Sequence, residues 1–184
     1  MPTRNRLSTR VLLICAAIGV ATGIAGGIAG IITPAFLIVA APLYGLVLGV
    51  HVLPGIIAQE LLRLPFVAII THLIAALVGS AFAVGFAPRY LGTALLFGAI
   101  QEGVAALTRY RAWRAWRFFL SGIIIGIIVA VVVAFVANLS SMALWAQIMY
   151  FAVSILGPVA WTAVALGIGA GLRRAGVARG TGIR

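Results

Sequence analysis

Apolar runs long enough to cross a bilayer occupy most of this sequence. Residues 64–88 and residues 118–172 contain no Asp, Glu, Lys or Arg. A run of about 20 apolar residues predicts a membrane-spanning helix. Only 8% of the residues are charged, whereas soluble domains carry about 25%. Because the runs are continuous, they lack the alternation of polar and apolar residues that marks the strands of a β-barrel. The chain is therefore predicted to be an all-α integral membrane protein.

The charged residues and the breaks between them predict six transmembrane helices. Residues 11–62 and the run at 118–172 each have room for two spans, and residues 64–88 and 90–108 have room for one each. Thr33-Pro34 predicts a loop between the first two spans, and Asn138 to Ser141 predicts one between the last two. The predicted spans are 11–32, 42–62, 65–84, 90–110, 116–137 and 146–172.

The arginines predict the orientation of these spans, since cytoplasmic loops carry an excess of Lys and Arg. All 13 basic residues are arginines. With six spans, Arg89 lies alone on one side and the other 12 arginines lie on the side of both termini. Both termini are therefore predicted to be cytoplasmic, with a basic N-terminus at 1–10, a membrane domain at 11–172 and a basic tail at 173–184. Topology explains the net charge of +11, so no nucleic acid partner is expected.

Small residues recur along the first predicted span in two rows. The glycines at 19, 23 and 27 form one row, and alanines form the other. Small residues at this spacing let two helices approach closely in lipid. One row fits a docking face for another membrane subunit, and packing within the chain is the alternative. The predicted docking residues are Ala17, Ala21, Ala25 and Ala29.

Glu102 lies inside the fourth predicted span, where an ionised carboxylate is costly unless it is paired or hydrated. It is a candidate to bind an amine or cationic ligand or to relay a proton. The alternative is a structural partner for His72, Gln101 or an arginine. His51 and His72 lie in the second and third spans, and His72 is the better candidate because it lies nearer the middle of its span. No metal site is predicted, because further ligands are missing.

Other polar and aromatic residues are expected near the two membrane surfaces. Glu60 and Arg63, three residues apart, predict a structural ion pair. The arginines at 111, 114 and 117 would share one helical face, near lipid head groups or a cytoplasmic partner. No Walker A motif or hydrolase triad is present, so neither enzymatic activity nor a cofactor is predicted. The residues that could surround a flat ring on the outer side, or simply form an aromatic belt, are Tyr44, Asn138, Trp145, Gln147 and Trp161.

Several sequence pieces give the chain a family resemblance. They are PLYG at 42–45, RLPFVAIITHLIAALVG at 63–79, VAALTRYRAW at 104–113 and LSG at 120–122. In this order and spacing they resemble the S components of energy-coupling factor (ECF) vitamin transporters, in the YkoE-type branch linked to thiamin and its hydroxymethylpyrimidine precursor. Phe97 stands where that branch has a glutamine, and His72 stands where it often has an acidic residue. These departures leave open a ligand other than thiamin.

The resemblance implies a substrate-capture subunit in the bacterial inner membrane. Such a subunit binds its vitamin in a pocket near the outer face, built by spans four to six and the first loop. It docks through the alanine row of span one on a transmembrane coupling subunit that is driven by two cytoplasmic ATPases. The implied ligand residues are Glu102, Gln101, His72, Tyr44, Asn138, Trp145, Gln147 and Trp161.

Two other classes of function stay open at this point. The small-residue helix fits a non-transport membrane scaffold, and Glu102 fits a stand-alone proton-coupled carrier. Glu102 also lies nearer the cytoplasmic end of its span than an outer pocket requires.

Overall fold

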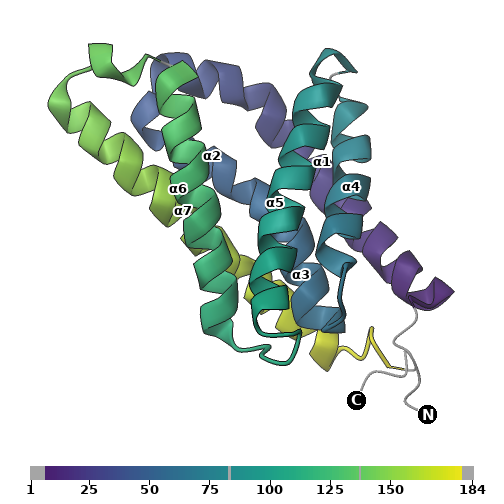
Figure 1. Cartoon of the computed structure of the whole chain (residues 1–184). Helices are drawn as coiled ribbons and strands as arrows, with labels where there is room; N and C mark the ends of the chain where they lie inside the picture. The colour runs from purple at the N-terminus through teal and green to yellow at the C-terminus, as the bar shows by residue number, and fades with distance from the viewer. Residues whose placement is uncertain (1–6, 83, 137, 180–184) are drawn as a thin grey trace.

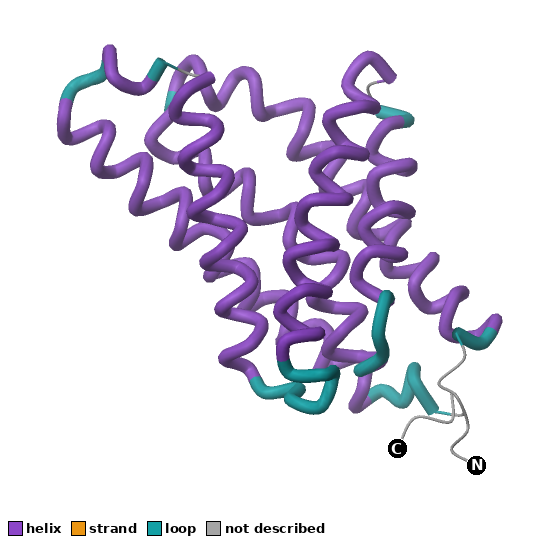
Figure 2. Tube along the Cα trace, viewed as in Figure 1, coloured by secondary structure: helices purple, strands orange, loops and turns teal. Residues whose placement is uncertain are grey.

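The computed structural model describes residues 7–82, 84–136 and 138–179. The regular elements of these residues are helices joined by short loops (Figure 2). Five stretches are long and apolar enough to cross a membrane, and α4 is a sixth, shorter apolar helix. The prediction of an all-α membrane fold with six helices is confirmed. The elements in chain order are α1 (Thr9–Val39), η1 (Ala41–Leu43), α2 (Tyr44–Leu48), η2 (Gly49–Val52), α3 (Leu53–Leu62), α4 (Val67–Ser80), η3 (Val84–Phe86), α5 (Ala87–Leu107), α6 (Ala115–Val136), η4 (Leu139–Ser141) and α7 (Leu144–Arg174).

The start of α1, the end of α7 and the α5–α6 loop lie at one end of the helix bundle (Figure 1). We call this the terminal end; the far end holds the α4–α5 and α6–α7 connections. This arrangement agrees with an even number of crossings. That the terminal end faces the cytoplasm stays a prediction from the arginines. The predicted tails at 1–10 and 173–184 lie partly outside the described residues.

The loop predicted at Thr33-Pro34 is wrong, because α1 continues through Pro34 to Val39. Proline cannot donate the backbone hydrogen bond that a helix interior needs. Membrane helices tolerate this because nearby side chains and neighbouring helices satisfy the freed groups. The Thr33 hydroxyl donates to the carbonyl oxygen of Ala29 at 2.8 Å, in the turn before the hydrogen bond that Pro34 cannot make. The loop predicted between the last two spans is confirmed, since η4 separates α6 from α7.

The second span is a broken helix, made of η1, α2, η2 and α3 in succession. Glycines let this span approach α7 closely. A Cβ built on Gly45 would overlap the backbone of Val153 and Ser154, and one built on Gly157 would overlap the backbone of Gly45. The crossing of the second span and α7 therefore requires both glycines.

The glycine row of α1 packs inside this protein, against α4 and the turn that follows it. A Cβ on Gly23 would lie 2.7 Å from the carbonyl oxygen of Ala75, and one on Gly27 would lie 2.6 Å from the Phe82 ring. Of the two alternatives for small residues, packing within the chain thus applies to the glycines. The alanine row lies on another face, where Ala17 and Ala21 are exposed, Ala25 is half-buried and Ala29 is buried.

Candidate functional site

A cavity of about 390 Å³ lies in the far half of the bundle, between α1, the second span, α5 and α6. Its polar lining comes from α1, the second span and the first two turns of α5. The other side is an apolar wall of α6. The polar residues of the lining are Thr33, Tyr44, His51, Arg89, Tyr90 and Thr93, and the α6 wall consists of Ile128, Val129, Val132, Val133 and Val136.

The polar side of this cavity brings together segments far apart in the sequence. Tyr44 is buried, and its hydroxyl lies beside the Arg89 guanidinium. Arg89 and Thr93 are four residues apart on α5, so they share one face of that helix. His51 comes from η2, the irregular part of the second span. Tyr44 and His51 are seven residues apart, about two helical turns, so they lie on the same side of the second span and both line the cavity.

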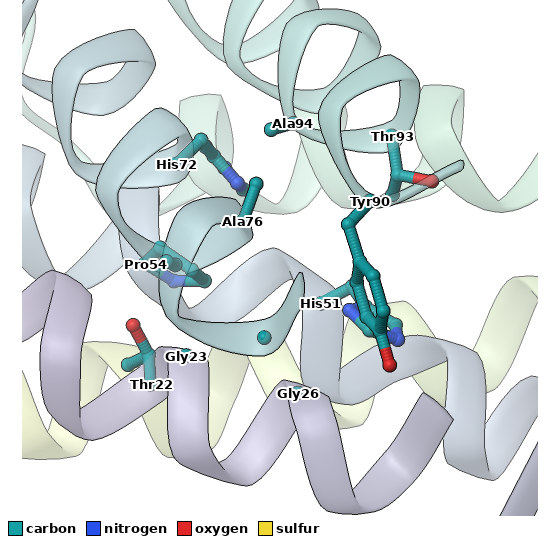
Figure 3. Close-up of a pocket in the computed structure, with 12 residues that line it drawn as sticks. Thr22, Gly23, Gly26, His51, Pro54, His72, Ala76, Tyr90, Thr93 and Ala94 are labelled. Atoms are coloured by element: carbon teal, nitrogen blue, oxygen red, sulfur yellow. The ribbon is translucent and has the colours of Figure 1, made fainter. Parts of the chain in front are cut away.

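A second cavity of about 30 Å³ adjoins the first and also touches His51, Tyr90 and Thr93. A space of this size holds a water molecule. His72 and Thr22 contribute to its wall (Figure 3). The small cavity thus lies between the main cavity and the buried side chains around His72.

The side chains around His72 form a buried polar cluster between the cavity and the terminal end. The Gln101 amide nitrogen donates to the Val52 carbonyl oxygen at 3.2 Å, and its oxygen lies 3.0 Å from His72 Nε2. The amide oxygen can only accept, so Nε2 of His72 carries the proton in this arrangement. Gly55 makes room for the pair, because a Cβ there would overlap the Gln101 side chain. The contact between His72 and Gln101 joins α4 to α5.

Glu102 also has structural partners, and it does not line the main cavity. Its carboxylate accepts hydrogen bonds from the backbone N–H groups of Phe66, at 3.0 Å, and Ala68, at 2.8 Å. These groups lie at the start of α4, where backbone donors have no partner within the helix. Burial and the neighbouring carboxylate raise the pKa of Tyr110, in the α5–α6 loop, to about 12. Glu102, on a distant helix, therefore caps the start of α4.

Arg117 is buried, with 1% of its surface exposed. Its guanidinium carbon lies 4.3 Å from the centre of the Trp113 ring and 4.4 Å from the centre of the Phe118 ring. Its Nη2 atom lies 3.4 Å from Gln59 Oε1. The prediction that the arginines at 111, 114 and 117 share a helical face is wrong, because α6 begins only at Ala115. Arg111 and Arg114 lie in the preceding loop and are exposed.

The predicted ion pair of Glu60 is confirmed and enlarged. Glu60 Oε1 lies 3.9 Å from Arg63 Nη2 and also pairs with Arg173 at the end of α7. Arg173 donates in addition to the backbone carbonyl oxygen of Glu60 at 2.9 Å. These contacts join α3 to the end of α7 at the terminal end.

Four other predicted ligand residues lie outside the main cavity. Asn138 accepts a hydrogen bond from Ser140 in the α6–α7 connection. Trp145 is exposed, Gln147 donates to the Met142 carbonyl oxygen, and Trp161 donates to the Leu46 carbonyl oxygen. Of the eight predicted ligand residues, only Tyr44 lines the main cavity, and His72 lines the small one beside it.

Sequence reasoning did not select His51, Arg89, Tyr90 or Thr93 as ligand residues. A usable signal existed for Arg89, which is the one arginine on the outer side of the predicted topology. It served only to count spans.

Comparison with known proteins gives two matches. The family model described as ABC-type cobalt transport system, permease component, matches residues 10–128. A solved structure described as the crystal structure of an S-component of an ECF transporter is also similar, with a TM-score of 0.78 and 17% sequence identity. The alignment covers 94% of this chain and 89% of the chain in that structure. At that identity the likeness shows the fold. No curated protein matches the chain.

Proposed function

Because the chain belongs to the family of ABC-type cobalt transport system permease components, we propose that it is the S component of an ECF transporter, a subunit that captures a small organic molecule. The family consists of transport components rather than enzymes. The main support beyond the family is the cavity of about 390 Å³ in the far half of the bundle, since small-molecule sites in proteins are concave and mostly apolar with a few polar groups.

The proposed ligand is an organic molecule rather than the metal of the family description. The described residues hold no group of three or more His, Cys, Asp or Glu side chains that could bind a metal ion. His51 is the only such side chain on the main cavity. Thiamin and its hydroxymethylpyrimidine precursor are the ligands that the sequence resemblance suggests, and they are the first compounds to test.

The proposed docking surface is the exposed part of the alanine row. Ala17 and Ala21 line an apolar groove of about 460 Å³ between α1, α3 and α7. Leu13 and Leu172 extend its apolar wall, and Arg10 lies at its edge. Small residues beside a groove suit the close approach of a helix from the coupling subunit. Ala29 is buried, so the proposed contact covers the terminal half of α1.

The proposal is tested by co-expressing the chain with the coupling subunit and the two ATPases from the same organism. We expect the four proteins to purify together. Ala21→Trp should weaken this association, because a large side chain would fill the groove, and Val131→Trp on an exposed face of α6 is the matched control. Association that neither substitution changes would contradict the docking surface.

Ligand capture is measured by calorimetry on the purified chain with thiamin and hydroxymethylpyrimidine. Saturable binding of either compound supports the resemblance. Self-association of the isolated chain without any of the three partners would instead support a scaffold. Substrate flux into liposomes that contain this chain alone would support a stand-alone carrier.

A further inference from the structure

The main cavity has one charged group, and that group is positive. Among the residues that the structure describes, Arg89 is the only charged one on its lining. The whole chain has two acidic residues, Glu60 and Glu102, and neither lines the cavity. The ion pairs of the described residues join Glu60 to Arg63 and Arg173, and leave Arg89 without a carboxylate partner. The described residues therefore supply no negative charge to a ligand in this cavity.

Hydrogen-bonding side chains surround Arg89 on the same side of the cavity. The Tyr44 hydroxyl lies beside the guanidinium. Tyr90 follows Arg89 on α5, and His51, Tyr90 and Thr93 line both the main cavity and the small cavity drawn in Figure 3. Tyrosine and threonine hydroxyls can donate to a ligand oxygen, as can a protonated ring nitrogen of histidine. This side of the cavity suits a group that accepts hydrogen bonds.

The opposite wall of the cavity is apolar. It consists of Val129, Val132, Val133 and neighbouring residues of α6, none of which can form a side-chain hydrogen bond. A ligand that fills the cavity therefore needs an apolar or aromatic surface on one side and acceptors on the other. A second charge placed against α6 would lose its hydration without a partner.

From these observations we infer that the captured substrate is a small amphipathic organic anion. Its carboxylate, or another single anionic group, binds Arg89 and the Tyr44 hydroxyl, and its apolar body packs on α6. An arginine guanidinium matches the planar carboxylate with two parallel N–H donors. The inference rests on the proposed function and defines its substrate class. It makes thiamin a poor ligand, because the thiamin cation would lie near Arg89 with no carboxylate to balance it.

The test compares each acid with a neutral analogue that has the same structure apart from the carboxylate. The probes are nicotinate with nicotinamide, biotin with biotin amide, and pantothenate with panthenol, together with thiamin and hydroxymethylpyrimidine. Binding to the purified full chain is measured by calorimetry. We expect at least one acid to bind and its neutral partner to bind about 10- to 100-fold more weakly, the usual range for hydrogen bonds to a charged group.

Two variants link the preference to the site. Arg89→Gln should weaken the acid about 10- to 100-fold and leave its neutral partner nearly unchanged. Arg114→Gln removes the same charge from an exposed position in the α5–α6 loop, and it should bind both compounds as the unmodified chain does. Because Arg89 is itself exposed, its replacement is not expected to unfold the chain.

An anionic lipid head group offers the same chemistry as a soluble anion, so binding is repeated in nanodiscs of phosphatidylglycerol and of phosphatidylcholine. If Arg89→Gln alters only the response to phosphatidylglycerol, Arg89 is a lipid contact and the inference is overturned. It is also overturned if no acid binds, or if a neutral or cationic compound binds best and is indifferent to Arg89→Gln. Continued association with the coupling subunit and ATPases in those cases would leave the proposed function standing.

Discussion

Glu102→Gln separates a structural glutamate from a ligand-binding one. The carboxylate accepts hydrogen bonds from the backbone N–H groups of Phe66 and Ala68, at 3.0 and 2.8 Å, and Glu102 is only 7% exposed. Glutamine keeps one acceptor oxygen and turns an amide N–H toward the other backbone N–H. The variant therefore loses one hydrogen bond to a charged group, worth about 1.5–3 kcal/mol, and weakens the other.

The expected loss of unfolding free energy is about 3 kcal/mol. For a chain of this size, each kcal/mol lowers Tm by about 2–4 °C, so Tm should fall by about 6–12 °C. Cys15 supplies the readout, because it is the only cysteine and is buried. A thiol-reactive fluorescent dye will report its exposure as the chain unfolds in detergent.

Glu60→Gln is the comparison, since it removes the only other acidic side chain. Glu60 is as buried as Glu102, at 7% exposed, but the side chains of its partners Arg63 and Arg173 are 42% and 40% exposed. Solvent therefore screens these pairs in part, and the expected loss is smaller, about 1 kcal/mol. The structural argument fails if Glu102→Gln unfolds within about 1 °C of the unmodified chain. It also fails if the variant keeps its Tm and loses saturable binding of a ligand.

Two further substitutions probe the packing. Gly45→Ala should destabilise the chain by several kcal/mol, because its Cβ would overlap the α7 backbone; Gly167→Ala, with open space around it, should leave Tm nearly unchanged, and equal Tm values would refute the close crossing. Arg117→Ala should cost about 3 kcal/mol through lost packing on Trp113 and Phe118. Arg117→Met should cost less, since it keeps most of the volume and removes an Nε that has no hydrogen-bond partner. A Met variant less stable than the Ala variant would indicate that the charge itself is required.

The sequence by itself determined the class, the number of helices and most of their bounds. Lipid cannot satisfy exposed backbone groups, so a long apolar run has to be helical. That rule acts on each run separately, which is why 116–137 and 146–172 agree closely with α6 and α7. It does not say where a helix stops within a long run, and so the first span was predicted to end at residue 32, whereas α1 continues to Val39.

The roles of individual polar residues were decided by the tertiary structure. Glu102 stood out because a carboxylate in an apolar run is costly, but the pattern could not show that the start of α4 supplies its two donors. Arg89 marked only the topology in the sequence, whereas the tertiary structure places it with Tyr44 and His51 on the lining of one cavity. Local sequence reports the cost of burying a polar group, whereas its partner depends on which distant helix packs beside it.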